Sequence, residues 1–185
     1  MTLVPRSRSL GLVVLLLLAQ LLAAASASGT RDPEQHFFQE SFGNYQEELQ
    51  IAREQGKDGV LIFFEMEECP FCHRMKQTVL NQVEVQEYFR EHFAIFAVDI
   101  EGDVEITDFQ GNVKKMKDWA FKDHGVRATP VFAFFDLDGE RVARFTGPTA
   151  GVKEFMWLGQ YVVQHQYKEM PFARYKRMKR REARG

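Results

Sequence analysis

The feature that most constrains this chain is a short apolar run that is followed, after an acidic loop, by the only two cysteines in the sequence. Residues 59–64 are rich in β-branched and aromatic side chains, which is typical of a buried strand. Cys69 and Cys72 come next, and Pro70 directly follows the first of them. Proline is well tolerated in the first turn of a helix, where its missing N–H costs nothing. The sequence therefore predicts a strand, a tight turn and a helix that begins at the cysteines.

This arrangement places Cys69 at a helix N-terminus, where unpaired N–H groups and the helix dipole favour a thiolate. A thiolate with a second thiol close behind it attacks a disulfide and then resolves the mixed disulfide that forms. We expect Cys69 to be the exposed nucleophile and Cys72, one turn further along the helix, to be the buried resolving thiol.

A purely structural disulfide is the simpler interpretation of a Cys-x-x-Cys pair in an oxidising compartment. Such a short loop contributes little stabilisation, however, because the chain-entropy effect of a disulfide grows with loop length. A chain of 185 residues is also long enough to build a hydrophobic core of its own. A redox or metal-binding role is therefore favoured.

The N-terminus has the features of an export signal. Two arginines precede an apolar run over residues 10–22, which is shorter than the ~20 residues of a comfortable membrane span. Small residues at positions 23–28 offer cleavage sites after Ala25 or Ala27. We predict that residues 1–27 are a cleavable signal peptide, with an uncleaved anchor as the alternative. The formal net charge of -2 gives no indication of nucleic-acid binding.

The remaining apolar patterns predict helices that alternate with strands. We expect helices over residues 36–55, 71–93 (with a break near Asn81), 114–124 and 150–167, and strands over 60–64, 93–100, 131–136 and 141–145. Asp138-Gly139 predicts a hairpin turn between the last two strands. Residues 101–113 indicate a small hairpin or an irregular insertion. The order fits an α/β fold with a central mixed sheet flanked by helices.

These features together resemble the thioredoxin superfamily. Cys69-Pro70-Phe71-Cys72 matches its redox motif, and residues 125–132 are similar to its segment around a cis proline. The resemblance covers residues 35–172 and implies a thioredoxin fold. It also implies that Pro130 is cis and faces the cysteines, that the Thr129 backbone pairs with an extended substrate segment, and that the Cys69–Cys72 disulfide is the only redox group, without a further cofactor.

More closely, the chain resembles exported bacterial thioredoxins linked to sulfur-oxidation gene clusters, the SoxW type. It shares their insertion at residues 107–111 and a final helix over residues 155–168. This resemblance implies a periplasmic thiol–disulfide oxidoreductase that reduces protein disulfides of the cell envelope and is recharged by a membrane thiol-transfer protein. An oxidase or isomerase is the alternative. We expect a monomer, because the sequence has no extra apolar helix that would serve as a dimerisation arm.

One position departs from the family pattern. Cytosolic thioredoxins carry a buried aspartate six residues before the first cysteine, which helps to move the proton of the second cysteine. Phe63 occupies that position here. The proton acceptor for Cys72 is therefore open, with Glu65 or water as candidates.

Several residues around the cysteines are expected to tune the redox pair: Glu67, Glu68, Pro70, Phe71 and His73. Negative charge beside a thiolate disfavours it, and a less stable thiolate makes the dithiol a better reductant. The acidic pair would thus favour a disulfide reductase. Alternatively, both carboxylates point into solvent and have little effect.

Two other chemistries share this motif. His73 completes the Cys-x-x-Cys-His pattern of c-type haem attachment, but haem attachment needs neither a preceding buried strand nor a downstream Thr-Pro hairpin. Met66 and Met75 extend the cysteine pair to four sulfurs at three-residue spacing, and soft sulfur ligands suit Cu(I). Methionine is also common core filler, so we assign no metal and keep a copper-handling protein as an alternative.

The C-terminal tail, residues 173–185, is strongly basic. The simpler expectation is a solvated, frayed terminus. The alternative is a patch that contacts anionic lipid or an acidic partner.

Overall fold

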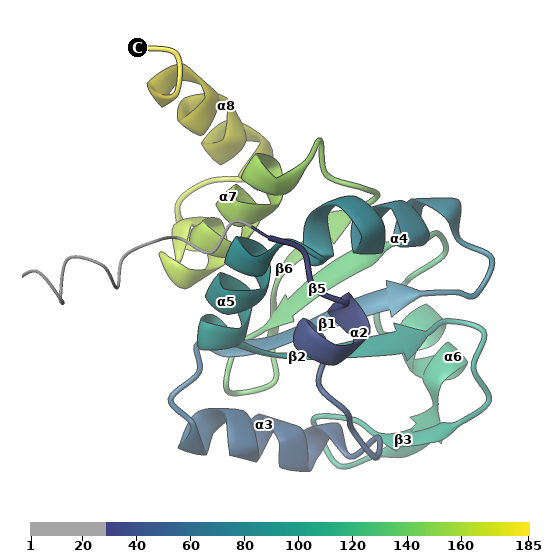
Figure 1. Cartoon of the computed structure of the whole chain (residues 1–185). Coiled ribbons are helices and arrows are strands. Elements are labelled where there is room, and N and C mark those ends of the chain that lie inside the picture. The colour runs from purple at the N-terminus through teal and green to yellow at the C-terminus, as the bar shows by residue number, and fades with distance from the viewer. Residues whose placement is uncertain (1–28) are drawn as a thin grey trace, which may run out of the picture.

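The computed structural model describes residues 29–185, so the predicted signal peptide lies outside the described residues (Figure 1). Four strands form one mixed sheet in the order β2–β1–β5–β6. The strands are β1 (Gly59–Glu65), β2 (Phe93–Asp99), β5 (Val131–Phe135) and β6 (Arg141–Thr146). β1 pairs in parallel with β2, whereas β5 is antiparallel to both of its neighbours. The prediction of a central mixed sheet flanked by helices is confirmed.

The central strands are apolar along their whole length because both faces of the sheet are covered. Alternate residues of β1 point to opposite faces: Leu61 and Phe63 join one core, and Val60, Ile62 and Phe64 join the other. The first core is completed by α4 (Pro70–Met75), α5 (Val83–His92) and α7 (Val152–Val163). The second is completed by α3 (Tyr45–Glu54) and the π-helix η3 (Trp119–Asp123).

The prediction of a single helix over residues 36–55 is wrong. The chain instead forms α2 (Pro33–His36) and α3, with an extended crossing between them. Phe37 and Phe38 pack in the first core, whereas Tyr45 and Leu49 pack in the second, so the chain must pass around the edge of the sheet. It does so beside β2, where the Gln39 N–H donates to the Ile95 carbonyl at 2.8 Å.

The start of α3 is fixed by local polar contacts. Gly43 has a φ of +83°, a backbone conformation that glycine adopts readily. Asn44 then caps the helix, because its side-chain oxygen accepts the Glu47 N–H at 3.2 Å. A glycine followed by an N-capping asparagine is a local signal for a helix start at this point. The helical spacing of apolar residues over 36–55 obscures that signal.

The predicted break near Asn81 is confirmed. α4 continues into the π-helix η2 (Lys76–Leu80), and two residues separate η2 from α5. The N-terminal segment of the described chain covers the break: the Arg31 N–H donates to the Asn81 carbonyl at 2.8 Å, and the Val83 N–H donates to the Gly29 carbonyl at 3.1 Å. The backbone groups released at the break are thereby satisfied.

The insertion after β2 is a hairpin, which is one of the two predicted forms. It consists of β3 (Glu105–Thr107) and β4 (Val113–Lys115), followed by the short helix α6 (Met116–Asp118) and η3. The helix predicted over residues 114–124 is therefore shorter than expected, because its first two residues pair in the hairpin.

The C-terminal tail is ordered, so the expectation of a frayed terminus is wrong for residues 172–182. After α7 the chain makes a 3-10 turn, η4 (Gln166–Lys168), and then forms α8 (Phe172–Glu182). α8 contacts α7 and projects beyond the rest of the molecule (Figure 1). No helix among residues 29–185 has both the length and the apolar character that a membrane crossing requires.

Candidate redox site

The two cysteines form a disulfide at the start of α4. Cys69 is the N-cap residue and adopts an extended backbone conformation, while Pro70 occupies the first turn. The Cα atoms of Cys69 and Cys72 are 5.2 Å apart. The Cys72 N–H donates to Cys69 Sγ at 3.0 Å. In the reduced protein this N–H and the positive end of the helix would stabilise a thiolate on Cys69.

Cys69 is not exposed in this disulfide form, so that part of the sequence-based expectation is wrong. It is 2% exposed and Cys72 is fully buried. Both belong to the apolar core that lies beneath α4 and α7. The N-cap position directs the Cys69 side chain back over the first turn of the helix, toward Cys72, rather than into solvent.

The Thr129-Pro130 segment lies at the same end of the sheet as the cysteine loop. Its peptide bond is cis. β5 begins at the next residue, Val131, which pairs with Phe64 near the end of β1. The neighbouring Pro130 carbonyl accepts the Gly147 N–H at 2.8 Å.

Thr129 itself has free hydrogen-bonding capacity. Its hydroxyl oxygen is buried without a partner among the described residues. Among the same residues, neither its backbone N–H nor its carbonyl forms a hydrogen bond. Both backbone groups are thus available to an extended segment of another protein.

The residues expected to tune the pair form the exposed rim of the site. Glu67 and Glu68 lie in the turn after β1, and their side chains are exposed, as are those of Pro70 and His73. Phe71, between the cysteines, is 53% exposed although it is a large apolar residue. The position of these side chains agrees equally with a tuning role and with simple solvation.

Phe63, in the position where cytosolic thioredoxins carry an acid, is fully buried in an aromatic cluster. Its ring centroid lies 4.9 Å from that of Phe132 and 5.5 Å from that of Phe38. The site therefore has no carboxylate at that position. The partly buried acid near the cysteines is Glu65, two residues further along β1.

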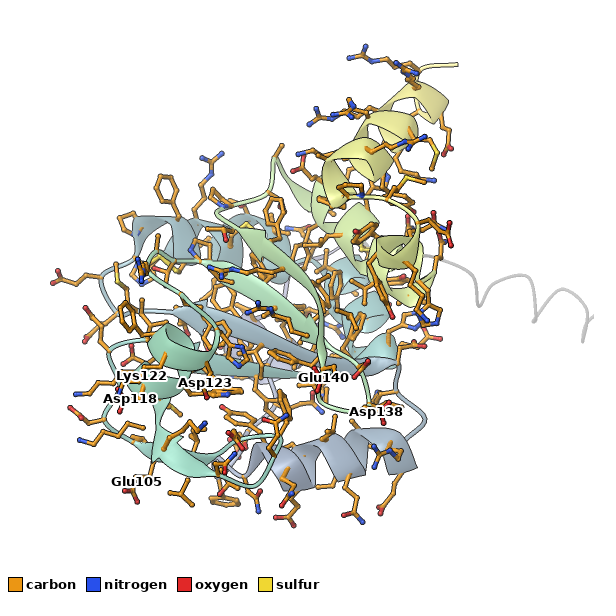
Figure 2. The ribbon with its side chains drawn as sticks, turned by 180° about the vertical axis from the view of Figure 1, so that it is seen from behind. Glu105, Asp118, Lys122, Asp123, Asp138 and Glu140 are labelled. Atoms are coloured by element: carbon orange, nitrogen blue, oxygen red, sulfur yellow. A yellow bond between two sulfur atoms is a disulfide. The ribbon has the colours of Figure 1, made fainter. Side chains whose placement is uncertain are left out.

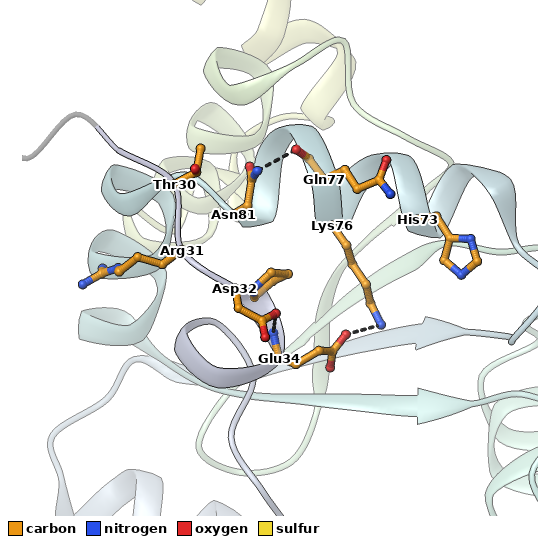
Figure 3. Close-up of a pocket in the computed structure, with 9 residues that line it drawn as sticks. Thr30, Arg31, Asp32, Glu34, His73, Lys76, Gln77 and Asn81 are labelled. Atoms are coloured by element: carbon orange, nitrogen blue, oxygen red, sulfur yellow. Dashed lines mark hydrogen bonds and ion pairs between the residues drawn. The ribbon is translucent and has the colours of Figure 1, made fainter.

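Glu65 is paired with a lysine that the sequence analysis did not single out. Lys76 Nζ lies 2.8 Å from the Glu65 carboxylate. It also lies 2.7 Å from Glu34 Oε1, a pair that Figure 3 shows. Lys76 follows Cys72 by four residues, so the two side chains lie on the same face of the helix. That i, i+4 spacing is the signal that would have identified Lys76; Glu34 lies too far away in sequence to be found in this way.

The environment changes the acidity of both groups. Burial raises the pKa of Glu65, and the Lys76 ammonium only partly opposes that effect. Burial disfavours the Lys76 cation, but hydrogen bonds to Glu34 and Glu65 outweigh it and raise the pKa of Lys76. Glu65 is thus a weaker acid than usual, which suits a group that exchanges protons with a thiol.

The methionines of the possible copper set take part in core packing. Met75 is 1% exposed, and its sulfur lies 3.8 Å from the Thr149 hydroxyl. Met66 packs partly buried against the same core as the two cysteines. Within the described range, no cluster of three or more His, Cys, Asp or Glu side chains is arranged to hold a metal ion.

The sequence matches the family profile of a Thioredoxin-like domain over residues 45–162, more than half of the chain. This protein belongs to the thioredoxin-like family. The superfamily prediction is thereby confirmed, and the thioredoxin-like fold with its disulfide-forming pair supports thiol–disulfide oxidoreductase chemistry. No curated protein matches the sequence.

Solved structures agree with the thioredoxin-like fold. A thioredoxin-fold protein from Helicobacter pylori has 20% identity and a TM-score of 0.56, covering 68% of this chain and 86% of that one. A thioredoxin from Thermus thermophilus has 26% identity and a TM-score of 0.51, covering 65% and 84%. A DsbH oxidoreductase has 16% identity and a TM-score of 0.53, covering 79% and 98%.

Proposed function

We propose that this protein reduces disulfides of other proteins in the periplasm through its Cys69–Cys72 pair. The observation that carries the proposal is the disulfide at the N-terminus of α4, where the Cys72 N–H donates to Cys69 Sγ at 3.0 Å. It lies at the same end of the sheet as a Thr129 backbone with both polar groups free.

The exchange has two steps. The reduced Cys69 thiolate attacks one sulfur of a client disulfide, and the other client sulfur leaves as a thiolate that takes up a proton. The Cys72 thiol then loses its proton and its sulfur attacks Cys69 Sγ, which releases the second client thiol. Two electrons pass to the client, and the chain is left with the Cys69–Cys72 disulfide seen in the structure.

The proton of Cys72 needs an acceptor, and we assign this role to Glu65. Three observations support it: the carboxylate is partly buried, its pKa is raised, and its partner Lys76 shares a helix face with Cys72. Proton transfer passes directly or through one water, as is usual for general bases.

The reducing direction rests on the charge of the rim. Glu67 and Glu68 precede Cys69 and disfavour its thiolate, which lowers the reduction potential of the pair. Pro70, Phe71 and His73 complete this rim and contact the client or modulate the thiols.

The SoxW-type resemblance supports the wider setting. We propose that the chain is exported, that a membrane thiol-transfer protein returns it to the dithiol form, and that it acts as a monomer without a further cofactor. Its clients would be cell-envelope proteins with reducible disulfides.

Trapping tests the exchange. Replacing the resolving residue by Cys72→Ser should leave mixed disulfides between Cys69 and client proteins in cells, visible as thiol-sensitive high-mass bands. The matched variant Cys69→Ser should give none. If Cys72→Ser accumulates no mixed disulfides, the exchange mechanism is wrong.

The reduction potential tests the direction. A value nearer thioredoxin, about -270 mV, supports a reductase, whereas a value near about -120 mV identifies an oxidase and contradicts the reducing role.

Copper titration tests the alternative of a copper-handling protein. Tight binding of Cu(I) to the reduced protein would favour a metal-handling role over disulfide reduction.

A further inference from the structure

The C-terminal helix α8 carries three arginines on one face, and a fourth follows in the turn after the helix. Arg174, Arg177 and Arg181 are spaced by three and four residues, so they fall within an arc of about 60° on a helix of 3.6 residues per turn, and Arg184 comes two residues after the end of α8. All four are exposed. Within residues 29–185, no carboxylate lies at ion-pair distance from any of them. We refer to these four residues as the arginine stripe.

The opposite face of α8 fixes the helix on the body of the protein. Tyr175 is 2% exposed and donates a hydrogen bond to the Gln164 side chain at 3.2 Å. Glu154 of α7 is buried and pairs with Lys176 at 2.9 Å and with Arg180 at 3.1 Å. These two cations are therefore occupied, while the arginine stripe is held facing solvent.

Charge is distributed unevenly over the molecule. Residues 172–185 contain seven Lys and Arg against one acid, Glu182, whereas residues 29–171 contain fifteen Lys and Arg against twenty-five Asp and Glu. Figure 2 shows acidic side chains at the end of the molecule remote from α8, around β3 and the β5–β6 turn: Glu105, Asp118, Asp123, Asp138 and Glu140. The body is acidic and the projecting helix is basic.

The arginine stripe borders an amphipathic hollow of about 470 Å³. Its walls are three of the arginines together with Met170, Met178 and Glu182. Met178 is 39% exposed, so apolar surface lies directly beside the guanidinium groups. This combination fits a phosphodiester group attached to an apolar chain, because guanidinium binds phosphate oxygens in a bidentate way.

We propose that the arginine stripe binds the surface of a bilayer that contains anionic phospholipids. A straight row of like charges on one helix face complements a plane, and the acidic body is repelled by the same plane, so the molecule is oriented with α8 toward the lipid. The apolar face of α8 is used against α7, so the contact is electrostatic and the helix does not insert.

A second copy of this chain is the less favourable occupant. Its acidic end already pairs with local cations, as Asp118 does with Lys122 and Asp123 with Lys114. A head-to-tail contact between α8 and that end would also be heterologous, so it would give a ring or an open filament and not a two-fold dimer.

Vesicle co-sedimentation tests the proposal on the full chain. We expect binding to phosphatidylcholine vesicles to increase when phosphatidylglycerol is included, and this increase to fall as ionic strength rises. Changing Arg174, Arg177, Arg181 and Arg184 to Gln should weaken the phosphatidylglycerol-dependent binding by at least about tenfold. All variants keep the apolar residues 10–22, so any vesicle binding through that segment is the same in each of them and does not affect the comparison.

The control removes four positive charges elsewhere. Arg53, Lys115, Lys117 and Lys122 are exposed members of surface ion pairs that contribute little to stability. Their combined change to Gln should leave vesicle binding unchanged. The proposal is overturned if both variants lose binding equally, if phosphatidylglycerol does not increase binding at low salt, or if the stripe variant abolishes self-association instead of vesicle binding.

Discussion

At the scale of single residues, Glu65 lies in a chain of three charged groups beside the redox helix. Lys76 Nζ lies 2.8 Å from the Glu65 carboxylate and 2.7 Å from Glu34 Oε1. Burial raises the pKa of Glu65 although Lys76 opposes that effect. A weakened acid of this kind can accept a proton from a thiol.

The Glu65 assignment leads to a kinetic prediction. In Glu65→Gln the side chain keeps its shape but no longer accepts a proton, so resolution by Cys72 should slow by about tenfold or more near pH 7. The loss should be smaller at high pH, where the Cys72 thiol ionises without help. Single-turnover reaction with an aromatic disulfide measures both steps, since each releases one coloured thiol.

Glu67→Gln is the matched control, because that carboxylate lies in the exposed turn beside the same site. It should leave the resolution step within about twofold of the original chain, a change well below that expected of a general base. Equal slowing in both variants would mean that overall charge, and not Glu65, determines the rate.

The sequence predicts only part of this site. The cysteine pair and Thr129-Pro130 can be identified because local rules govern a helix start and a strand start. Glu65 is one of two candidates for the proton acceptor, and apolar spacing does not single out its partner Lys76. Glu34 comes from a distant segment that reaches the helix only after folding, so no local pattern indicates it.

A second residue-scale prediction concerns His124. Burial among Phe64, Trp119 and Phe135, followed by repulsion from Arg141, lowers its pKa from 6.5 to about 4. Between those pH values the unfolded chain binds more protons than the folded one. The free energy of unfolding should therefore decrease as the pH falls from 6.5 to about 4.

His124→Gln should remove up to about 2 kcal/mol of this pH-dependent loss, a value that allows for the partial exposure of the ring. Urea unfolding at a series of pH values measures it. If the free energy of unfolding of His124→Gln depends on pH as strongly as that of the original chain, the titrating group is not His124.

At the scale of secondary structure, the strands were easier to predict than the first helices. β1, β2, β5 and β6 follow apolar runs whose composition itself reflects burial on both faces. The helix predicted over residues 36–55 failed for a tertiary reason: Phe37 and Tyr45 have helical spacing but pack on opposite faces of the sheet. The spacing of apolar residues indicates that a residue is buried, but it does not indicate in which of the two cores the residue packs.

Gly59 gives a prediction at this scale, since it begins β1 at a point of close backbone contact. A Cβ atom there would lie 2.1 Å from the Phe135 carbonyl oxygen. Gly59→Ala should therefore separate β1 from β5 locally and destabilise the fold by about 2–4 kcal/mol, measured as a lower urea midpoint with an unchanged m-value.

Gly29→Ala is the comparison, because its Cβ would meet only Val83 Cγ2, at an ordinary 3.7 Å. This variant should unfold within about 0.5 kcal/mol of the original chain. Similar stability of the two alanine variants would contradict the close contact between β1 and β5.

At the scale of the whole molecule, the remaining question is whether α8 belongs to the cooperative unit. The expected domain ends at residue 172, but α8 adds a buried tyrosine and the Glu154 ion pairs to the first core. Tyr175 contacts Tyr161 of α7 and Phe172, with ring centroids 5.5 and 6.5 Å away. Removing its ring leaves a cavity where α8 meets α7.

Tyr175→Ala should lower the free energy of unfolding by about 3 kcal/mol if α8 unfolds together with the sheet. Global unfolding followed by tryptophan fluorescence reports this, because both tryptophans lie outside α8: Trp119 is in the second core, on the other face of the sheet, and Trp157 is in α7. Tyr167→Ala, at a half-buried tyrosine of η4, should cost about 1 kcal/mol or less. If Tyr175→Ala instead leaves the fluorescence midpoint unchanged while α8 becomes sensitive to protease, the helix is a separate unit. The cooperative domain would then end before it.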